Sequence, residues 1–216
     1  MKPKVALFIY DPKCSVQSGN GVIRALGEHY DFRLFSKNEM EKGFFDNIDL
    51  VIFPGGFGDS DSYNRLLKEN KESIINYVNR GGHYLGICMG AYWAGSHYFD
   101  ILKDVDAVQY LKRPGTDTRR PHAKNISVTW ENEPMNMFWY DGCAITGKGK
   151  FDVVATYPNG DVMAGYQDRI GLIGSHPEAE KFWYDEYTWL AKVWDESVTR
   201  NNHELLHDFV NQLMLR

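Results

Sequence analysis

The chain has 216 residues, a formal net charge of −5 and 43% hydrophobic residues. This length and apolar content suit one α/β domain whose core is stable without disulfides. The negative charge and the absence of a dense Lys/Arg run argue against nucleic acid or an anionic membrane as the main partner.

The cysteines and the amino end of the chain predict a compartment. The three cysteines, at positions 14, 88 and 143, are odd in number and scattered, which does not suggest a disulfide framework. The sequence starts with Met1-Lys2-Pro3-Lys4 and runs straight into an apolar segment, and no stretch is long and apolar enough to cross a bilayer. We therefore expect a cytoplasmic protein with free thiols.

The first half of the chain alternates apolar runs with helical patterns. Strands that are apolar almost without interruption are typical of a sheet covered on both faces. The alternation of such strands with helices predicts a doubly wound, mostly parallel sheet. Strands are predicted at residues 4–10, 32–35 and 49–53 and in the run that enters Cys88, and helices at about 21–30 and in the long segment that ends at Arg80-Gly81-Gly82.

The second half of the chain changes character. Residues 98–147 contain three prolines, many polar residues and short extended runs, which predict an irregular β-containing region. No internal repeat or convincing linker is visible, so the chain is predicted to form a single domain over residues 1–216. Strands are predicted at residues 151–157, 161–166 and 169–173, and the C-terminal helices, within residues 180–215, at about 180–197 and 203–215.

The most specific pattern in the chain lies in residues 81–92. A short apolar run ends at Gly86-Ile87-Cys88-Met89-Gly90, and an apolar helix start follows. This Gly-x-nucleophile-x-Gly spacing is typical of a nucleophile elbow, with sulfur in place of hydroxyl. Small neighbours allow a tight turn, backbone N–H groups can hold an oxyanion, and the positive end of the helix favours thiolate. The alternative is a small buried cysteine in a glycine-rich turn.

A thiol nucleophile needs a base and a group that orients the base. His176 is singled out among the seven histidines because an apolar strand delivers it to a loop at the carboxyl end of the sheet, where such folds place their sites. Glu178 follows across a proline and can hold the imidazole. Taken singly, His176 also fits a loop histidine, and Glu178 fits an acid at a helix start.

Three sequence blocks follow one another along the chain: Phe53-Pro54-Gly55-Gly56, Gly86-Ile87-Cys88-Met89-Gly90 and Gly174-Ser175-His176-Pro177-Glu178. Together they resemble the class I glutamine amidotransferase-like superfamily. Within it, the chain is most similar to the amidotransferase-like domain at the amino end of eukaryotic-type biotin-protein ligases, which also occurs as a free-standing protein. The resemblance spans nearly all of residues 4–180 and implies a flavodoxin-like, doubly wound sheet with helices on both faces.

The resemblance also implies roles for individual residues. Cys88, His176 and Glu178 would form the catalytic triad. The backbone N–H groups of Gly56 and Met89 would form the oxyanion hole. No cofactor and no metal ion is implied.

The substrate is less well defined by the resemblance. Gly55 and Tyr92 are expected to contact it. Family members that use glutamine usually place Gln where this chain has Tyr92, so the use of glutamine is not implied. The remaining residues cannot hold a biotin-ligase catalytic domain, and an amidotransferase role would need a separate partner protein.

Three functions follow from these patterns. The first is a Cys-His-Glu hydrolase or amidotransferase-like enzyme that acts on an amide-type bond of a small molecule through a thioester. The second is a non-catalytic ligand-binding or regulatory domain. The third is a redox sensor in which Cys88 pairs with Cys14, a residue expected at the same edge of the sheet.

Two further groups of residues have alternative interpretations. The aromatic series from Phe182 to Trp194 either packs on the sheet or forms a dimer or lid contact. Arg113, Arg119 and Arg120 either are solvated loop charges or meet an acidic group of the substrate.

Overall fold

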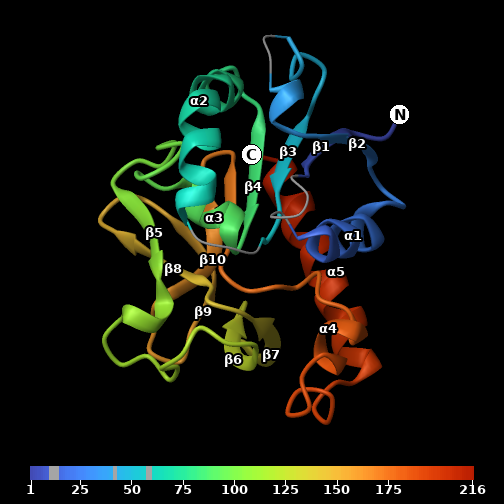
Figure 1. Ribbon diagram of the computed structural model, residues 1–216, viewed down its shortest axis with the longest axis vertical. Helices are drawn as coiled ribbons and strands as arrows, with labels where there is room; N and C mark the ends of the chain where they lie inside the picture. Colours follow the sequence, from blue (N-terminus) through green and yellow to red (C-terminus); the bar gives the residue numbers. More distant parts are fainter. Residues whose placement is uncertain (10–14, 41–42, 57–59) are drawn as a thin grey trace.

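The computed structural model describes residues 1–9, 15–40, 43–56 and 60–216, and the side chains of these residues except 60–69 and 196–200. Its centre is a sheet of 11 strands. Helices cover both faces of the parallel half of this sheet, and the strands of the second half of the chain extend it on the other side (Figure 1). The α/β fold class predicted from the sequence is confirmed.

Parallel strands occupy one half of the sheet, in the order β2-β1-β3-β4-β11. β11 comes from far along the chain and pairs in register with β4, from Tyr84 opposite Ile170 to Ile87 opposite Ile173. The carboxyl ends of β3, β4 and β11 therefore meet at one edge. The bounds are β1 (Lys4–Phe8), β2 (Asp31–Phe35), β3 (Leu50–Phe53), β4 (His83–Ile87) and β11 (Ile170–Ile173).

The other strands form an antiparallel extension. From β11 the sheet continues through β10, β9, β6 and β7, while β5 and β8 form a branch that pairs with β10. The region predicted as irregular thus supplies β5 to β8 and the 3-10 helix η2 (Tyr110–Lys112). The bounds are β5 (Val105–Gln109), β6 (Lys124–Trp130), β7 (Glu133–Trp139), β8 (Cys143–Gly147), β9 (Asp152–Thr156) and β10 (Val162–Gln167).

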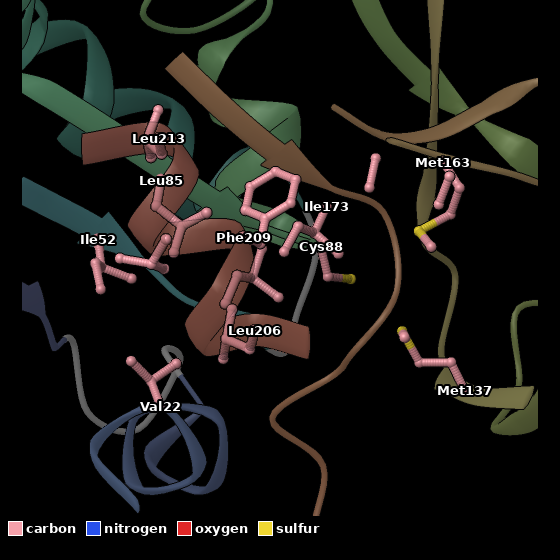
Figure 2. Packing of buried hydrophobic residues seen from close by; sticks show 14 of the residues in the cluster. Val22, Ile52, Leu85, Cys88, Met137, Met163, Ile173, Leu206, Phe209 and Leu213 are labelled. Carbon is pink, nitrogen blue, oxygen red and sulfur yellow. The ribbon is translucent and has the colours of Figure 1, made fainter. Parts of the chain in front are cut away.

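Helices α1 (Val16–Leu26) and α5 (Glu196–Met214) cover one face of the parallel strands, and α2 (Ser60–Asn79) and α3 (Met89–Ala94) cover the other (Figure 1). Side chains alternate between the faces, as the two-residue period of a strand requires. Val5 and Leu7 pack with residues of α1 and α5, whereas Ala6 and Phe8 pack with residues of α2 and α3. Figure 2 shows the first cluster, in which side chains of α1 and α5 surround Ile52 and Leu85.

The remaining elements are short. Helix α4 (Lys181–Asp185) and the 3-10 helix η1 (Lys37–Glu39) lie in connecting segments. The helix predicted at residues 180–197 ends at Asp185, so most of that prediction is wrong. Beyond Asp185 the backbone forms turns: Leu190 N–H donates to Tyr187 O and Val193 N–H donates to Leu190 O, both at 2.9 Å. Each of these bonds joins residues three positions apart, as in a 3-10 turn.

The first helix begins earlier than its apolar stripe predicts. It starts at Val16 because the Ser15 hydroxyl accepts a hydrogen bond from Ser18 N–H at 3.0 Å and so caps the helix. The sequence did not predict a helix start at Val16, because the segment contains Gly19 and Gly21 and glycine is a poor helix former. The cap brings Ser15, Gln17 and Ser18 to the edge of the sheet where β3 ends.

We expect Gly90→Ala to destabilise the fold strongly. A Cβ atom at position 90 would lie 1.8 Å from Phe53 O, a backbone atom that cannot move without disturbing β3. Such overpacking lowers the free energy of unfolding by about 1–3 kcal/mol or more. Gly19→Ala is the matched control, because its Cβ would meet only Leu7 Cδ2 at 3.8 Å. Equal midpoints in urea denaturation for the two variants would contradict the expected close packing.

Candidate active site

The three sequence blocks meet at the carboxyl edge of the sheet. Gly55 and Gly56 follow β3, Cys88 follows β4, and His176 lies shortly after β11. These strands are neighbours in the order β3-β4-β11. A site at this edge is where open parallel sheets place their ligands.

Cys88 lies between β4 and α3 in a strained conformation. Its φ is 49°, a left-handed value that is uncommon for a residue with a side chain. Its backbone N–H donates to Ile173 O at 2.8 Å, which fixes the turn to β11. A Cβ at Gly86 would lie 2.4 Å from Gly90 O, so a side chain there would prevent the tight turn. This geometry is that of a nucleophile elbow.

The sulfur of Cys88 faces a small cavity. Cys88 is only 6% exposed, and its Sγ lies 3.5 Å from Tyr140 O, to which it donates. Figure 2 shows the side chain next to Ile173, at the border of the core cluster. Cys88 and His176 both line this cavity, whose volume is about 40 Å³. The other described residues that line it are Ser15, Gln17, Gly56, Phe138, Tyr140, Trp183, Glu186 and Tyr187.

His176 and Glu178 form a buried pair. His176 Nδ1 lies 2.8 Å from Glu178 Oε1, and the exposed fractions of the two residues are 5% and 0%. Burial alone would lower the pKa of His176, but the charges of Glu178 and Cys88, together with hydrogen bonds to both, raise it to about 10. Because Nδ1 is taken by Glu178, Nε2 is the nitrogen that can serve Cys88.

The raised pKa makes this pair sensitive to alkaline pH. A free histidine has a pKa of about 6.5, so the charged imidazole stabilises the fold fully below that pH. The stabilisation is lost as the pH rises through the folded value of about 10. The direction of this shift favours the imidazolium form of His176 at neutral pH.

Two aromatic rings pack against the imidazole. The centroids of the Trp183 and Phe138 rings lie 5.3 and 5.9 Å from that of His176. The backbone N–H of His176 also donates to the backbone carbonyl oxygen of Phe138 at 2.9 Å. The aromatic series of the C-terminal region therefore packs over the site, through Trp183 and Tyr187, rather than on the sheet alone.

Ser18 belongs to the site, although no sequence pattern pointed to it. Its hydroxyl donates to Glu178 Oε1 at 2.6 Å and accepts from Gly55 N–H at 2.9 Å. Ser18 is fully buried. The N-cap at Ser15 places Ser18 in the first turn of α1, but no local pattern links that turn to the end of β3.

Of the residues predicted to bind the oxyanion or the substrate, one lines the cavity and the others lie close to Cys88, His176 or Asp141. Gly56 lines it, and Met89 begins α3 directly after Cys88. Gly55 lies against the imidazole, because a Cβ there would lie 2.6 Å from His176 Cε1. Tyr92 donates its hydroxyl hydrogen to Asp141 O at 3.0 Å, and burial raises its pKa. Their roles toward an oxyanion and a substrate remain predictions.

Other candidate residues lie apart from this site or outside the described residues. Arg113 binds Asp161 through two hydrogen bonds of 2.8 and 3.0 Å and so is engaged within the protein. Cys143 is the first residue of β8 and is fully buried. Cys14 lies outside the described residues, so its pairing with Cys88 stays a prediction.

Among the residues that the structure describes, no group of three or more His, Cys, Asp and Glu side chains is placed to hold a metal ion. Within the same residues, no helix is long and apolar enough to span a membrane.

The chain is similar to known proteins in part of its sequence and in its fold. Residues 12–108 match the family described as biotin-protein ligase, N terminal, a stretch that includes Cys88 and ends before His176. The structure superposes on a glutamine amidotransferase from Thermotoga maritima with a TM-score of 0.71 and 13% identity over 99% of both chains. The predicted resemblance is confirmed. The chain has the class I glutamine amidotransferase-like fold, and residues 12–108 are similar to the biotin-protein ligase N-terminal family.

Two other relatives define how far this likeness extends. PurLQS from Thermotoga maritima matches with a TM-score of 0.69 and 16% identity, over 99% of this chain and 100% of that chain. An uncharacterized protein of Chlamydia muridarum is 37% identical over 68 residues, which make up 32% of this chain and 26% of that protein. The chain thus aligns with about a quarter of that relative's length. The amidotransferase-like structures share the fold at these low identities.

We expect iodoacetamide to modify Cys88 in the folded protein much faster than Cys143. Cys143 is fully buried in β8, and burial raises the pKa of its thiol well above the usual range. Cys88 instead lines the cavity. Peptide mass spectrometry over time measures the two rates, and in denaturant the rates should become similar. Equal labelling of both cysteines in the folded protein would contradict this placement.

Proposed function

We propose that the protein is a cysteine-dependent enzyme that cleaves an amide-type bond of a small molecule. The observation that carries this proposal is the His176–Glu178 pair on the same small cavity as the elbow residue Cys88. The amidotransferase-like structures share the fold at identities too low to indicate a common reaction, so the proposal rests on these residues of the site. A reducing cytoplasm would keep the cysteine in its thiol form.

The reaction would proceed in two steps. The sulfur of Cys88 attacks the carbonyl carbon, and His176 gives its Nε2 proton to the leaving nitrogen as the C–N bond breaks, leaving a thioester. Water then attacks the thioester and loses a proton to His176, which returns the thiolate and releases the acid. Backbone N–H groups of Gly56 and Met89 would hold the oxyanion in both steps. Glu178 keeps the imidazole oriented through its contact with Nδ1.

The described lining favours an amide other than free glutamine. Tyr92 occupies the position where glutamine-using members place Gln, and its hydroxyl is engaged by Asp141 O. The described residues of the lining include no Lys or Arg that could pair with the α-carboxylate of an amino acid.

The size of the cavity favours a second candidate function. Ligand pockets usually enclose about 300–1,000 Å³, and the cavity at Cys88 holds about 40 Å³. A non-catalytic regulatory domain that retains the elbow would need no larger opening. The two candidates differ in whether Cys88 is chemically activated.

The activation of Cys88 is testable by its alkylation rate as a function of pH. If His176 stabilises the thiolate, the wild type should react with iodoacetamide at pH 6, where His176→Ala should react at least about tenfold more slowly. His122→Ala is the matched control, because that histidine contacts Arg120 O and Trp189 instead. Identical profiles for wild type and His176→Ala would favour the regulatory domain.

Turnover is testable with a panel of primary amides, γ-glutamyl compounds and glutamine, measured by ammonia release. We expect at least one amide to be cleaved faster than glutamine. Because the nucleophile is essential in such a mechanism, Cys88→Ser should lower the rate at least about a thousandfold. Cys143→Ser, at a buried position in β8, serves as control. Turnover that persists in Cys88→Ser would rule out the thioester route.

A further inference from the structure

Ser18 connects two parts of the site through one hydroxyl group. Its Oγ donates to Glu178 Oε1 at 2.6 Å and accepts from Gly55 N–H at 2.9 Å. The side chain is fully buried and therefore does not exchange these partners for water in this structure. The hydroxyl uses both its donor and its acceptor capacity in these contacts.

The orientation of the Glu178 carboxylate depends on few partners. Oε1 accepts from Ser18 and is paired with His176 Nδ1. Oε2 is buried and has no hydrogen-bond partner among the described residues. Without Ser18, the imidazole of His176 would be the one remaining partner of the Glu178 carboxylate among the described residues. The carboxylate plane could then rotate about the Cγ–Cδ bond of Glu178.

The second contact of Ser18 reaches the loop after β3. Gly55 lies against the imidazole and directly precedes Gly56, the proposed oxyanion donor. Ser15 supports the same connection, since its N–H donates to Gly55 O at 3.1 Å while its hydroxyl caps the helix at Ser18 N–H. The start of α1 is thus fixed to this loop through backbone and side chain.

We infer that Ser18 is a positioning residue that acts through Glu178 and Gly55 to set the His176 imidazole toward Cys88. This inference rests on the proposed function, since it assigns a role within the same reaction. Ser18 does not touch the reacting atoms. Its effect should therefore appear in the pH dependence of Cys88, not only in stability.

The test is the pH profile of Cys88 alkylation by iodoacetamide in Ser18→Ala. We expect the pH of half-maximal rate to rise by about one unit relative to the wild type, because the imidazolium is held less well. Ser175→Ala is the matched control: Ser175 is equally buried and adjacent to His176, but its hydroxyl contacts Met137 Sδ and Met163 Sδ. Its profile should overlay that of the wild type.

The outcomes separate this inference from the proposed function. If His176→Ala changes the profile and Ser18→Ala does not, Ser18 is not a positioning residue and the enzyme proposal stands. If neither variant changes it, both fail. If Ser18→Ala does not fold, hydrogen exchange of the Gly55 amide in the wild type decides, because a free amide would exchange fast and overturn the inference, whereas slow exchange supports it.

Discussion

A carboxylate buried away from water is the constraint on which this site depends. Glu178 has no exposed surface, and an ionised carboxylate in such a place costs several kcal/mol unless it is paired. The imidazole of His176 and the hydroxyl of Ser18 supply that pairing, at 2.8 and 2.6 Å. The same interaction occupies Nδ1 of the imidazole, so the fold's need to compensate a buried charge also selects the nitrogen that can face Cys88.

The parallel half of the sheet brings these groups together. β3, β4 and β11 are adjacent and parallel, so strands that end at Phe53, Ile87 and Ile173 meet at one edge. Close backbone packing then fixes the segments, since Gly90 lies against Phe53 O and Gly55 against the His176 ring. Side chains at these glycines would separate the strand ends. The positions that look permissive in the sequence are therefore the positions where the structure has no spare room.

Local sequence patterns predicted the parts of this site that depend on a single turn or strand end. Cys88 was recognisable because an elbow needs small residues at fixed spacing, and His176 because an apolar strand leads into it. Ser18 was not recognisable, because its role arises from a contact with a residue 160 positions away. The segment 180–197 was likewise predicted as one helix, but the helix ends at Asp185, and Trp183 within it packs over Phe138 and His176.

The side chain at position 92 connects the helix after the elbow to a neighbouring turn. Its hydroxyl donates to Asp141 O, next to Tyr140, whose carbonyl accepts from the Cys88 thiol. Tyr92 thus joins the helix after the elbow to the β7–β8 turn that forms one wall of the cavity. A side chain committed to this contact is poorly placed to bind a ligand. The contacts of Tyr92 and of the Cys88 thiol therefore connect the elbow to this turn at two successive carbonyl groups, Tyr140 O and Asp141 O.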